Sequence, residues 1–289
     1  MRDARDERGA VAILALWAMA IVFALAVAAG FSMRAETAIA RNELAGTRAR
    51  YAAEAGAELG LAHLLARRAE GHTIFDGTPE NWQDGTIRVR VAITDEAGKI
   101  DLNVAPLPLL AGLLEAAGQK QEVAYLLACR IVAHRGTPSP DCPEPPDASP
   151  EPTALFAATE QVAQLPGFGD AIYQAISCCV TVLTGASAID PAVAPRLALM
   201  ALPGASTQMV DSWLGARASL MAMAPEMSGF QDLPVTPYFT VSPMRDFTIT
   251  AIAQTPEGAR ARADLSVRLT GQANHPYEIV AFRTPAPGP

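Results

Sequence analysis

Basic residues are scarce in this chain of 289 residues, which has 22 Lys and Arg against 30 Asp and Glu and a net charge of −8. A general nucleic-acid binder needs a basic surface that displaces counterions from phosphates, so that class is disfavoured and protein partners are favoured. Charged residues amount to only 18% and half of all residues are apolar. Disorder along the whole chain and a soluble cytosolic enzyme are therefore both disfavoured, and the length suits one large or two small domains.

Motifs for catalysis are also missing. The sequence contains no HExxH, GxSxG or CxxC, and its four histidines, His63, His72, His134 and His275, are scattered. Neither a zinc site nor an activated nucleophile has the spacing that it needs. We therefore expect no catalytic residues, no resident metal and no enzyme activity.

Only four cysteines occur, Cys129, Cys142, Cys178 and Cys179, and they fit no metal-ligand spacing. In an exported chain, a disulfide is the natural use of such residues. Cys129 lies on a predicted helix and Cys142 lies in segment 136–153, which has seven prolines in 18 residues and reads as a surface loop. A Cys129–Cys142 disulfide is favoured and would contribute about 3 kcal/mol. Buried inert thiols remain the alternative, and the other two cysteines stay unassigned.

One long apolar run stands near the N-terminus, where the 24 residues from Ala10 to Met33 carry no charge. As a helix this run would be about 36 Å long, enough to cross a hydrocarbon core of about 30 Å. Its leading segment, MRDARDERG, contains three arginines, and no small-x-small signal peptidase site precedes a globular region. The alternatives for this run are a cleaved secretory signal and a simple uncleaved anchor.

The helical pattern continues beyond the apolar run, because residues 34–70 contain no proline. One helix of about 60 residues, half in lipid and half outside it, is expected. Apolar residues recur at spacings of 7, 4, 4 and 3 and form one stripe, made of Leu44, Tyr51, Ala55, Leu59 and Ala62. Small residues that permit close approach of a helix or sheet also gather here, namely Ala52, Ala53, Gly56, Ala57 and Gly60.

Alternating residues predict a strand over 86–93, followed by a turn at 95–99. Further strands are predicted over 238–241, 247–254, 261–269 and 277–283, with a hairpin turn at Pro256-Glu257-Gly258. The sequence thus predicts an α+β fold in which a long helix packs on a small antiparallel sheet. Residues 100–233 are helical in pattern and punctuated by proline, and they are too many for a loop, so an inserted all-helical domain is expected.

Two sequence pairs recur loosely inside this insertion. Segment 100–106 (IDLNVAP) resembles 189–195 (IDPAVAP), and Leu-Pro-Gly occurs at 165–167 and 202–204. We expect Asp190 to cap a helix that starts at Pro191, and the glycines to break helices. Segment 165–170 (LPGFGD) also resembles a DNA-binding helix-hairpin-helix, but residues 100–200 hold ten acidic and four basic residues, so a structural turn is favoured.

Together, the N-terminal features resemble the class III signal of type IV pilins and type II secretion pseudopilins. The resemblance implies that prepilin peptidase cuts between Gly9 and Ala10, and that Ala10 becomes the N-methylated first residue. Ala10 is a mild departure from the usual Phe or Met. The family's glutamate at the fifth mature position is replaced by Leu14. That glutamate is thought to pair with the N-terminal amine of a neighbouring subunit, so a subunit with nothing ahead of it can dispense with it.

The middle of the chain is similar to the K family of minor pseudopilins (GspK), which share the IDLN-x-AP start, the LPG turns and a YF-x-V segment, here 238–241. The resemblance implies five parts: a leader (1–9), a transmembrane half-helix (10–33), a periplasmic half-helix (34–70), a sheet domain (71–99 and 234–289) and the insertion (100–233). It also implies a tip subunit of the pseudopilus in the inner membrane, with most of the chain periplasmic. Its partners would be the I-type and J-type pseudopilins and prepilin peptidase, with no nucleic acid.

Two alternatives stay open from the sequence. One is a type IV minor pilin or DNA-uptake component, and another is a simple membrane-anchored periplasmic interaction protein. For cofactors we expect none, although the resemblance allows calcium. The acidic residues of the proline-rich loop lack the order of an EF-hand and are favoured as solvated surface, so no ligand is assigned among Asp141, Glu144, Asp147 and Glu151.

Overall fold

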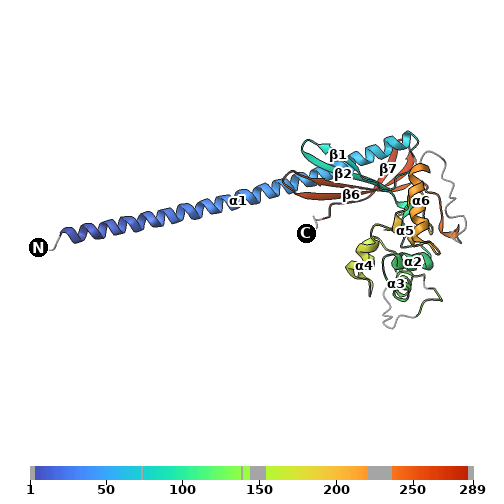
Figure 1. The fold of residues 1–289 in the computed structure, drawn as a ribbon. Helices are drawn as coiled ribbons and strands as arrows, with labels where there is room; N and C mark the ends of the chain where they lie inside the picture. Colours follow the sequence, from blue (N-terminus) through green and yellow to red (C-terminus); the bar gives the residue numbers. More distant parts are fainter. Residues whose placement is uncertain (1–3, 73, 138, 144–153, 221–235, 286–289) are drawn as a thin grey trace.

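The computed structural model describes residues 4–285, apart from 73, 138, 144–153 and 221–235, and the side chains of 4–12, 28–32, 35, 84, 218–220 and 236 are not described. A single long helix runs from the N-terminus to a small sheet, and the remaining helices gather at the end of the molecule opposite the N-terminus (Figure 1). The fold class expected from the sequence, a long N-terminal helix on a small antiparallel sheet with a large insertion, is confirmed.

Helix α1 (Ala4–Ala69) is continuous, as its proline-free sequence predicted. The sheet is antiparallel throughout, with the order β1-β2-β5-β6-β7. Its strands are β1 (Glu80–Asp84), β2 (Ile87–Asp95), β5 (Asp246–Gln254), β6 (Arg260–Gln272) and β7 (His275–Arg283). The hairpin between β5 and β6 closes as expected, with Thr255 N donating to Ala259 O at 3.0 Å.

Two strand assignments from the sequence differ from the structure. Strand β1 was missed because its sequence, ENWQD, has no alternation of apolar residues. The predicted strand over 238–241 was wrong: the 3₁₀ helix η4 (Thr236–Tyr238) ends there, and Phe239 makes one isolated bridge with Ile189. Tyr238 and Phe239 pack against the core of the insertion, which removes them from the main sheet.

Small residues allow α1 to lie directly on the sheet. The buried face of the helix consists largely of alanine and glycine, and its larger members are Leu61 and Leu64. A Cβ added to Gly56 would lie 2.6 Å from Cγ1 of Val89, and one added to Gly60 would lie 2.6 Å from Cγ2 of Ile249. Since real Cβ atoms do not approach other atoms so closely, β2 and β5 occupy the space that a methyl group would need. The sequence-based expectation of a closely approaching small-residue face is therefore confirmed.

The insertion leaves the sheet after β2 and has a hydrophobic core of its own. Its elements are η1 (Glu96–Gly98), β3 (Ile100–Asp101), α2 (Leu107–Ala116), α3 (Gln121–His134), η2 (Thr159–Gln164), α4 (Gly169–Ile176), β4 (Val180–Thr181), α5 (Arg196–Met200) and α6 (Thr207–Leu220). Strands β3 and β4 pair in parallel, so the insertion is mainly but not entirely helical.

The predicted helix start at Asp190 is wrong. The Asp190 carboxylate accepts a hydrogen bond from Ala192 N at 2.8 Å, but the chain then forms turns, and α5 begins only at Arg196 after Pro195. The glycine breaks were predicted correctly, because Gly167 and Gly204 have φ values of +82° and +81°.

The close approach of α1 to the sheet predicts opposite effects for two glycine substitutions. Gly60→Ala should lower the free energy of unfolding by about 1–3 kcal/mol, because the new methyl group pushes α1 away from Ile249. Gly46→Ala is the matched control: a Cβ there has no atom within 4 Å, so alanine's better helix propensity should stabilise the chain by up to about 1 kcal/mol. Urea denaturation measures both values. A Gly60→Ala variant as stable as the natural chain would contradict the packing.

Candidate assembly surface

The stripe predicted from sequence faces away from the sheet. Leu44, Tyr51 and Leu59 are 50%, 65% and 59% exposed, and Ala55 and Ala62 are also exposed. Helix α1 therefore has two apolar faces, one of small residues on the sheet and one of larger residues in solvent. We call the exposed set Leu44, Tyr51, Ala55, Leu59 and Ala62 the outer stripe. Aligned large apolar side chains on a solvated helix are typical of a protein contact surface.

A shallow apolar groove of about 420 Å³ lies beside this helix, between α1 and β7. Strand β7 is an edge strand of the sheet, so one side of its backbone is open to pairing in the structure described. On β7, Ile279 is 59% exposed and Phe282 is 47% exposed. The groove is lined by Glu58, Leu61, Ala62, Leu65, Leu265, Tyr277, Ile279 and Phe282. The groove and the outer stripe share Ala62, so both belong to one continuous apolar surface.

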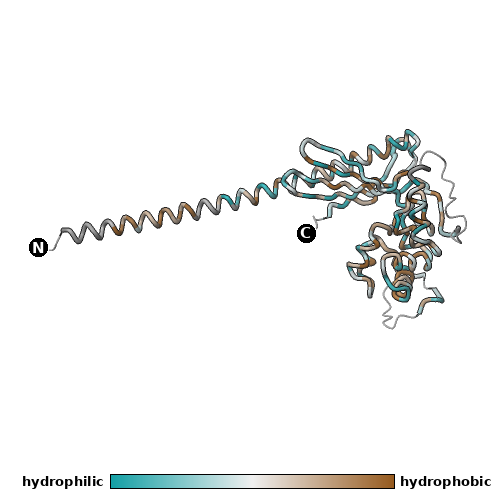
Figure 2. Tube along the Cα trace, viewed as in Figure 1, coloured by the Kyte–Doolittle hydropathy of each residue, from teal (hydrophilic) through white to brown (hydrophobic). Residues whose placement is uncertain are grey.

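Apolar residues dominate the N-terminal half of α1, whereas hydrophilic residues increase toward the sheet (Figure 2). Leu14, where the pseudopilin family has glutamate, is 69% exposed on this helix. Gly9 and Ala10 lie in the helix, but their side chains are outside the described residues, as are those of 28–32 in the predicted span. Among the described residues, no helical stretch combines the length and the hydropathy that a membrane crossing requires.

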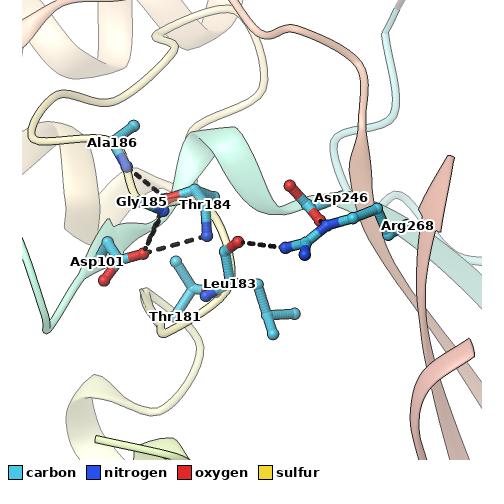
Figure 3. Close-up of polar contacts among 8 residues, drawn as sticks. All are labelled: Asp101, Thr181, Leu183, Thr184, Gly185, Ala186, Asp246 and Arg268. Carbon is cyan, nitrogen blue, oxygen red and sulfur yellow. Dashed lines mark hydrogen bonds and ion pairs between the residues drawn. The ribbon is translucent and has the colours of Figure 1, made fainter. Parts of the chain in front are cut away.

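Asp101 organises the place where the insertion meets the sheet (Figure 3). This carboxylate is 1% exposed and lies in the IDLN segment. Its Oδ2 accepts hydrogen bonds from Thr184 N at 3.1 Å, Thr184 Oγ1 at 3.0 Å and Gly185 N at 2.8 Å, while Oδ1 accepts one from Asn103 N at 2.9 Å. Four donors stabilise the buried charge, and they fix the loop that follows β4 against β3.

Arg268 of β6 connects that loop to the sheet (Figure 3). Its Nη2 donates to Leu183 O at 2.9 Å, and its Nε lies 2.6 Å from Oδ1 of Asp246 on β5. Burial raises the pKa of Asp246, and the hydrogen bond and charge of Arg268 oppose that rise. The guanidinium thus connects two strands of the sheet to the insertion through one carboxylate and one carbonyl.

A second polar junction lies at the end of β2. Ser242 Oγ donates to Oδ2 of Asp95 at 2.5 Å, and Ser242 N donates to Oδ2 of Asp190 at 2.6 Å. Burial is the main cause that raises the pKa of Asp95 to about 6; Asp190 and Glu96 raise it further, and the hydrogen bonds from Ser242 and Ala97 oppose the shift. Burial also raises the pKa of Asp190. Two carboxylates therefore share one serine where the chain returns from the insertion to the sheet.

A cleft of about 550 Å³ lies at the distal end of α1, and His63, Arg67 and Glu80 lie together in its lining. Arg67 Nη1 lies 3.1 Å from Oε1 of Glu80, and Oε2 of Glu80 lies 3.5 Å from His63 Nδ1. The His63 ring packs edge-on against Trp82 with centroids 5.7 Å apart. His63 therefore packs near the end of the helix, with Glu80 and Trp82 of β1 around it.

The cysteine pair favoured from sequence is joined: Cys129 and Cys142 form a disulfide with Cα atoms 5.6 Å apart, which holds the start of the proline-rich loop against α3. Of the four acidic loop residues considered for calcium, Glu144, Asp147 and Glu151 lie outside the described residues. Within the part of the chain that is described, no three His, Cys, Asp or Glu side chains are arranged to hold a metal ion.

The LPGFGD hairpin forms a tight connection before α4. Gly167 has a positive φ, and a Cβ there would collide with the Arg130 guanidinium. Arg130 Nη1 donates to Pro166 O, so this cation is engaged inside the chain. The geometry agrees with a structural turn.

Comparisons with known proteins show a likeness to solved structures. No family model and no curated protein matches the chain. Among solved structures, it is similar to a chain of the crystal structure of the GspK-GspI-GspJ complex from the enterotoxigenic Escherichia coli Type 2 Secretion System, with a TM-score of 0.58 and 15% sequence identity. The match covers 86% of this chain and 99% of that chain. At this low identity, the likeness shows a shared fold over nearly the whole of both chains.

The buried carboxylates predict how stability depends on pH. The pKa of Asp95 is about 6 in the folded chain and 3.8 in an ordinary aspartate, so between these two pH values the folded chain binds more protons than the unfolded chain. The free energy of unfolding should therefore fall as the pH rises from 3.8 to about 6. The contribution of Asp95 is on the order of 3 kcal/mol. Urea denaturation at several pH values should show the fall in the natural chain and a smaller fall in Asp95→Asn.

Asp76→Asn serves as the control, because hydrogen bonds from Thr78 and Arg217 lower the pKa of Asp76 despite its burial. Asp76 stays ionised throughout the window, so its loss should reduce stability without changing the slope against pH. If the free energy of unfolding of Asp95→Asn fell with pH as steeply as that of the natural chain, the assignment of this fall to Asp95 would be wrong.

Proposed function

We propose that the chain is a minor pseudopilin of a type II secretion system, the K-type subunit that initiates or caps the tip of the pseudopilus during protein export across the outer membrane. The observation that carries this proposal is the fold shared with a chain of the GspK-GspI-GspJ complex over 99% of that chain. The likeness includes most of the insertion that distinguishes this molecule from a plain helix-and-sheet pilin. The match covers 86% of this chain, and the unmatched 14% is far shorter than residues 100–233.

The outer stripe supports assembly through α1. Leu44, Tyr51 and Leu59 are exposed on a helix whose other face already covers the sheet, so the monomer leaves a second apolar face free for contact. Pseudopilins assemble by packing their N-terminal helices side by side. The partners proposed here are two other subunits, of the I and J types, and the outer stripe with the adjoining groove is the surface offered to them.

Two further features support a place at the tip. Leu14 supplies no carboxylate for the amine of a subunit ahead, which suits a subunit that has none ahead. The insertion lies at the end of the molecule opposite the N-terminus (Figure 1), and its bulk would hinder addition of another subunit beyond it. The role is structural, and we propose no catalytic step.

The N-terminal features support a pilin-type maturation route. Prepilin peptidase would cut between Gly9 and Ala10 on the cytoplasmic side and Ala10 would be methylated. The uncharged run from Ala10 to Met33 supports placement of this half-helix in the inner membrane, with the rest of the chain in the periplasm. The DNA-uptake alternative is not favoured, because Arg130 of α3, the cation beside the hairpin, is engaged by the Pro166 carbonyl and the surrounding segment is acidic.

Assembly through the outer stripe predicts a clear difference between two leucine substitutions. Leu59→Arg should weaken co-purification with the I-type and J-type subunits of the same system by about tenfold or more, because an arginine would be buried unpaired between helices. Leu155→Arg is the matched control in the insertion, since Leu155 is 65% exposed and Leu59 is 59% exposed. Co-expression of the full chains followed by affinity capture measures the effect.

Both leucines are exposed in the monomer, so neither change should move its unfolding midpoint appreciably. Retention of both partners by Leu59→Arg, or equal loss in the two variants, would count against assembly through this helix face.

A further inference from the structure

Cys178 and Cys179 are adjacent in the turn between α4 and β4, and the Cys129–Cys142 disulfide does not involve them. Their Sγ atoms lie 2.7 Å apart. Neighbouring side chains on an extended strand point to opposite faces, so the facing sulfurs are a property of this turn. Cys178 is exposed, whereas Cys179 is fully buried in the core of the insertion.

The backbone on both sides of the pair is fixed by hydrogen bonds. Cys179 N donates to Ile176 O at 2.9 Å, which ends α4, and Ile100 N donates to Cys179 O at 2.8 Å, which starts the β3–β4 ladder. The two side chains are therefore held in contact by secondary structure, and a local adjustment of the turn would bring the sulfurs from 2.7 Å to the bonded distance of about 2.05 Å.

The two thiols differ in reactivity. A hydrogen bond from the Cys179 thiol is the main cause that lowers the pKa of Cys178, and the charge of Lys99 contributes in the same direction. The same hydrogen bond and burial raise the pKa of Cys179. Cys178 thus combines exposure with thiolate character, which makes it the attacking sulfur, and Cys179 lies in position to resolve what Cys178 forms.

We propose that Cys178 and Cys179 are a redox modification site, in which adjacent thiols close into a reversible vicinal disulfide by exchange with an external disulfide. The Cys178 thiolate attacks one sulfur of the disulfide R–S–S–R and releases one thiolate RS⁻. Cys179 then loses its proton and attacks Cys178 Sγ, which releases the second RS⁻. The two cysteines lose two electrons and two protons, and the external disulfide gains both as two molecules of RSH.

This bond should open more readily than the Cys129–Cys142 bond. Neighbouring Cα atoms are about 3.8 Å apart, below the range of about 4.4–6.8 Å that suits a disulfide, and such departures make a bond more reducible. The Cα atoms of Cys129 and Cys142 are 5.6 Å apart, within that range. The chain would therefore hold one stable disulfide and one labile disulfide.

The site lies next to the junction between insertion and sheet. Strand β4 follows Cys179 directly, and the loop after it is the one held by Asp101 and Arg268. A closed ring would remove rotational freedom from the turn that leads into this loop. Oxidation would thus stiffen the attachment of the insertion, and reduction would restore its freedom.

The test treats the natural full-length chain, under native conditions, with oxidised glutathione as the external disulfide. After acid quenching and alkylation in denaturant, peptide mass spectrometry reads the state of each cysteine. We expect the peptide with Cys178 and Cys179 to lack two hydrogens and carry no alkyl group, with the Cys129–Cys142 link intact. Graded reduction should then open the vicinal bond before the other one.

Two variants identify the roles of the sulfurs. Cys179→Ser leaves Cys178 without a resolving thiol, so it should accumulate a glutathione adduct on Cys178. Cys178→Ser should not react, because Cys179 is buried. The natural chain alone also tests the proposal. Alkylation of both Cys178 and Cys179 after oxidation, a lasting glutathione adduct on Cys178, or a dimer linked through Cys178 would each overturn it.

Discussion

The approach of α1 to the sheet is so close that a methyl group at Gly56 or Gly60 would collide with β2 or β5. The rest of the molecule depends on this contact. Because the helix uses glycine and alanine toward the sheet, its leucine and tyrosine side chains at 44, 51 and 59 remain on the opposite face. One helix therefore serves two surfaces, an internal one that holds the sheet and an external one available to neighbouring subunits.

The insertion is attached to this helix-and-sheet unit through buried polar contacts. Asp101 and Arg268 fix the loop after β4, and Ser242 connects Asp95 with Asp190 where the chain returns to the sheet. Such contacts are directional, so they set the orientation of the insertion more narrowly than apolar packing alone would. A subunit proposed to end a filament needs its insertion in a fixed orientation, so that the insertion stays over the end of the filament.

Local patterns in the sequence predicted the continuous α1, the strands β2 and β5–β7, and the hairpin between β5 and β6. They failed where the deciding interaction is not local. Strand β1 is polar and pairs with β2 only, while Tyr238 and Phe239 are drawn to the core of the insertion. The spacing of the outer stripe was correct, but spacing alone could not show which face of α1 meets the sheet, because both faces are apolar.

The polar junctions were beyond prediction from sequence for a similar reason. Asp101 and Thr184 are 83 residues apart, and Asp95 and Ser242 are 147 residues apart. The IDLN segment marked Asp101 as part of a motif without indicating its partners. At Asp190, the aspartate-proline sequence resembled a helix start, yet the carboxylate is held by Ser242 and the helix begins six residues later.

The central claim is that this chain matures and assembles as a pseudopilin, and the mass of the N-terminal peptide of protein recovered from membranes tests it most directly. The account predicts a peptide that begins at N-methylated Ala10, and predicts that Gly9→Ala keeps the leader and blocks secretion. A natural chain that retains Met1, or normal processing of Gly9→Ala, would contradict it.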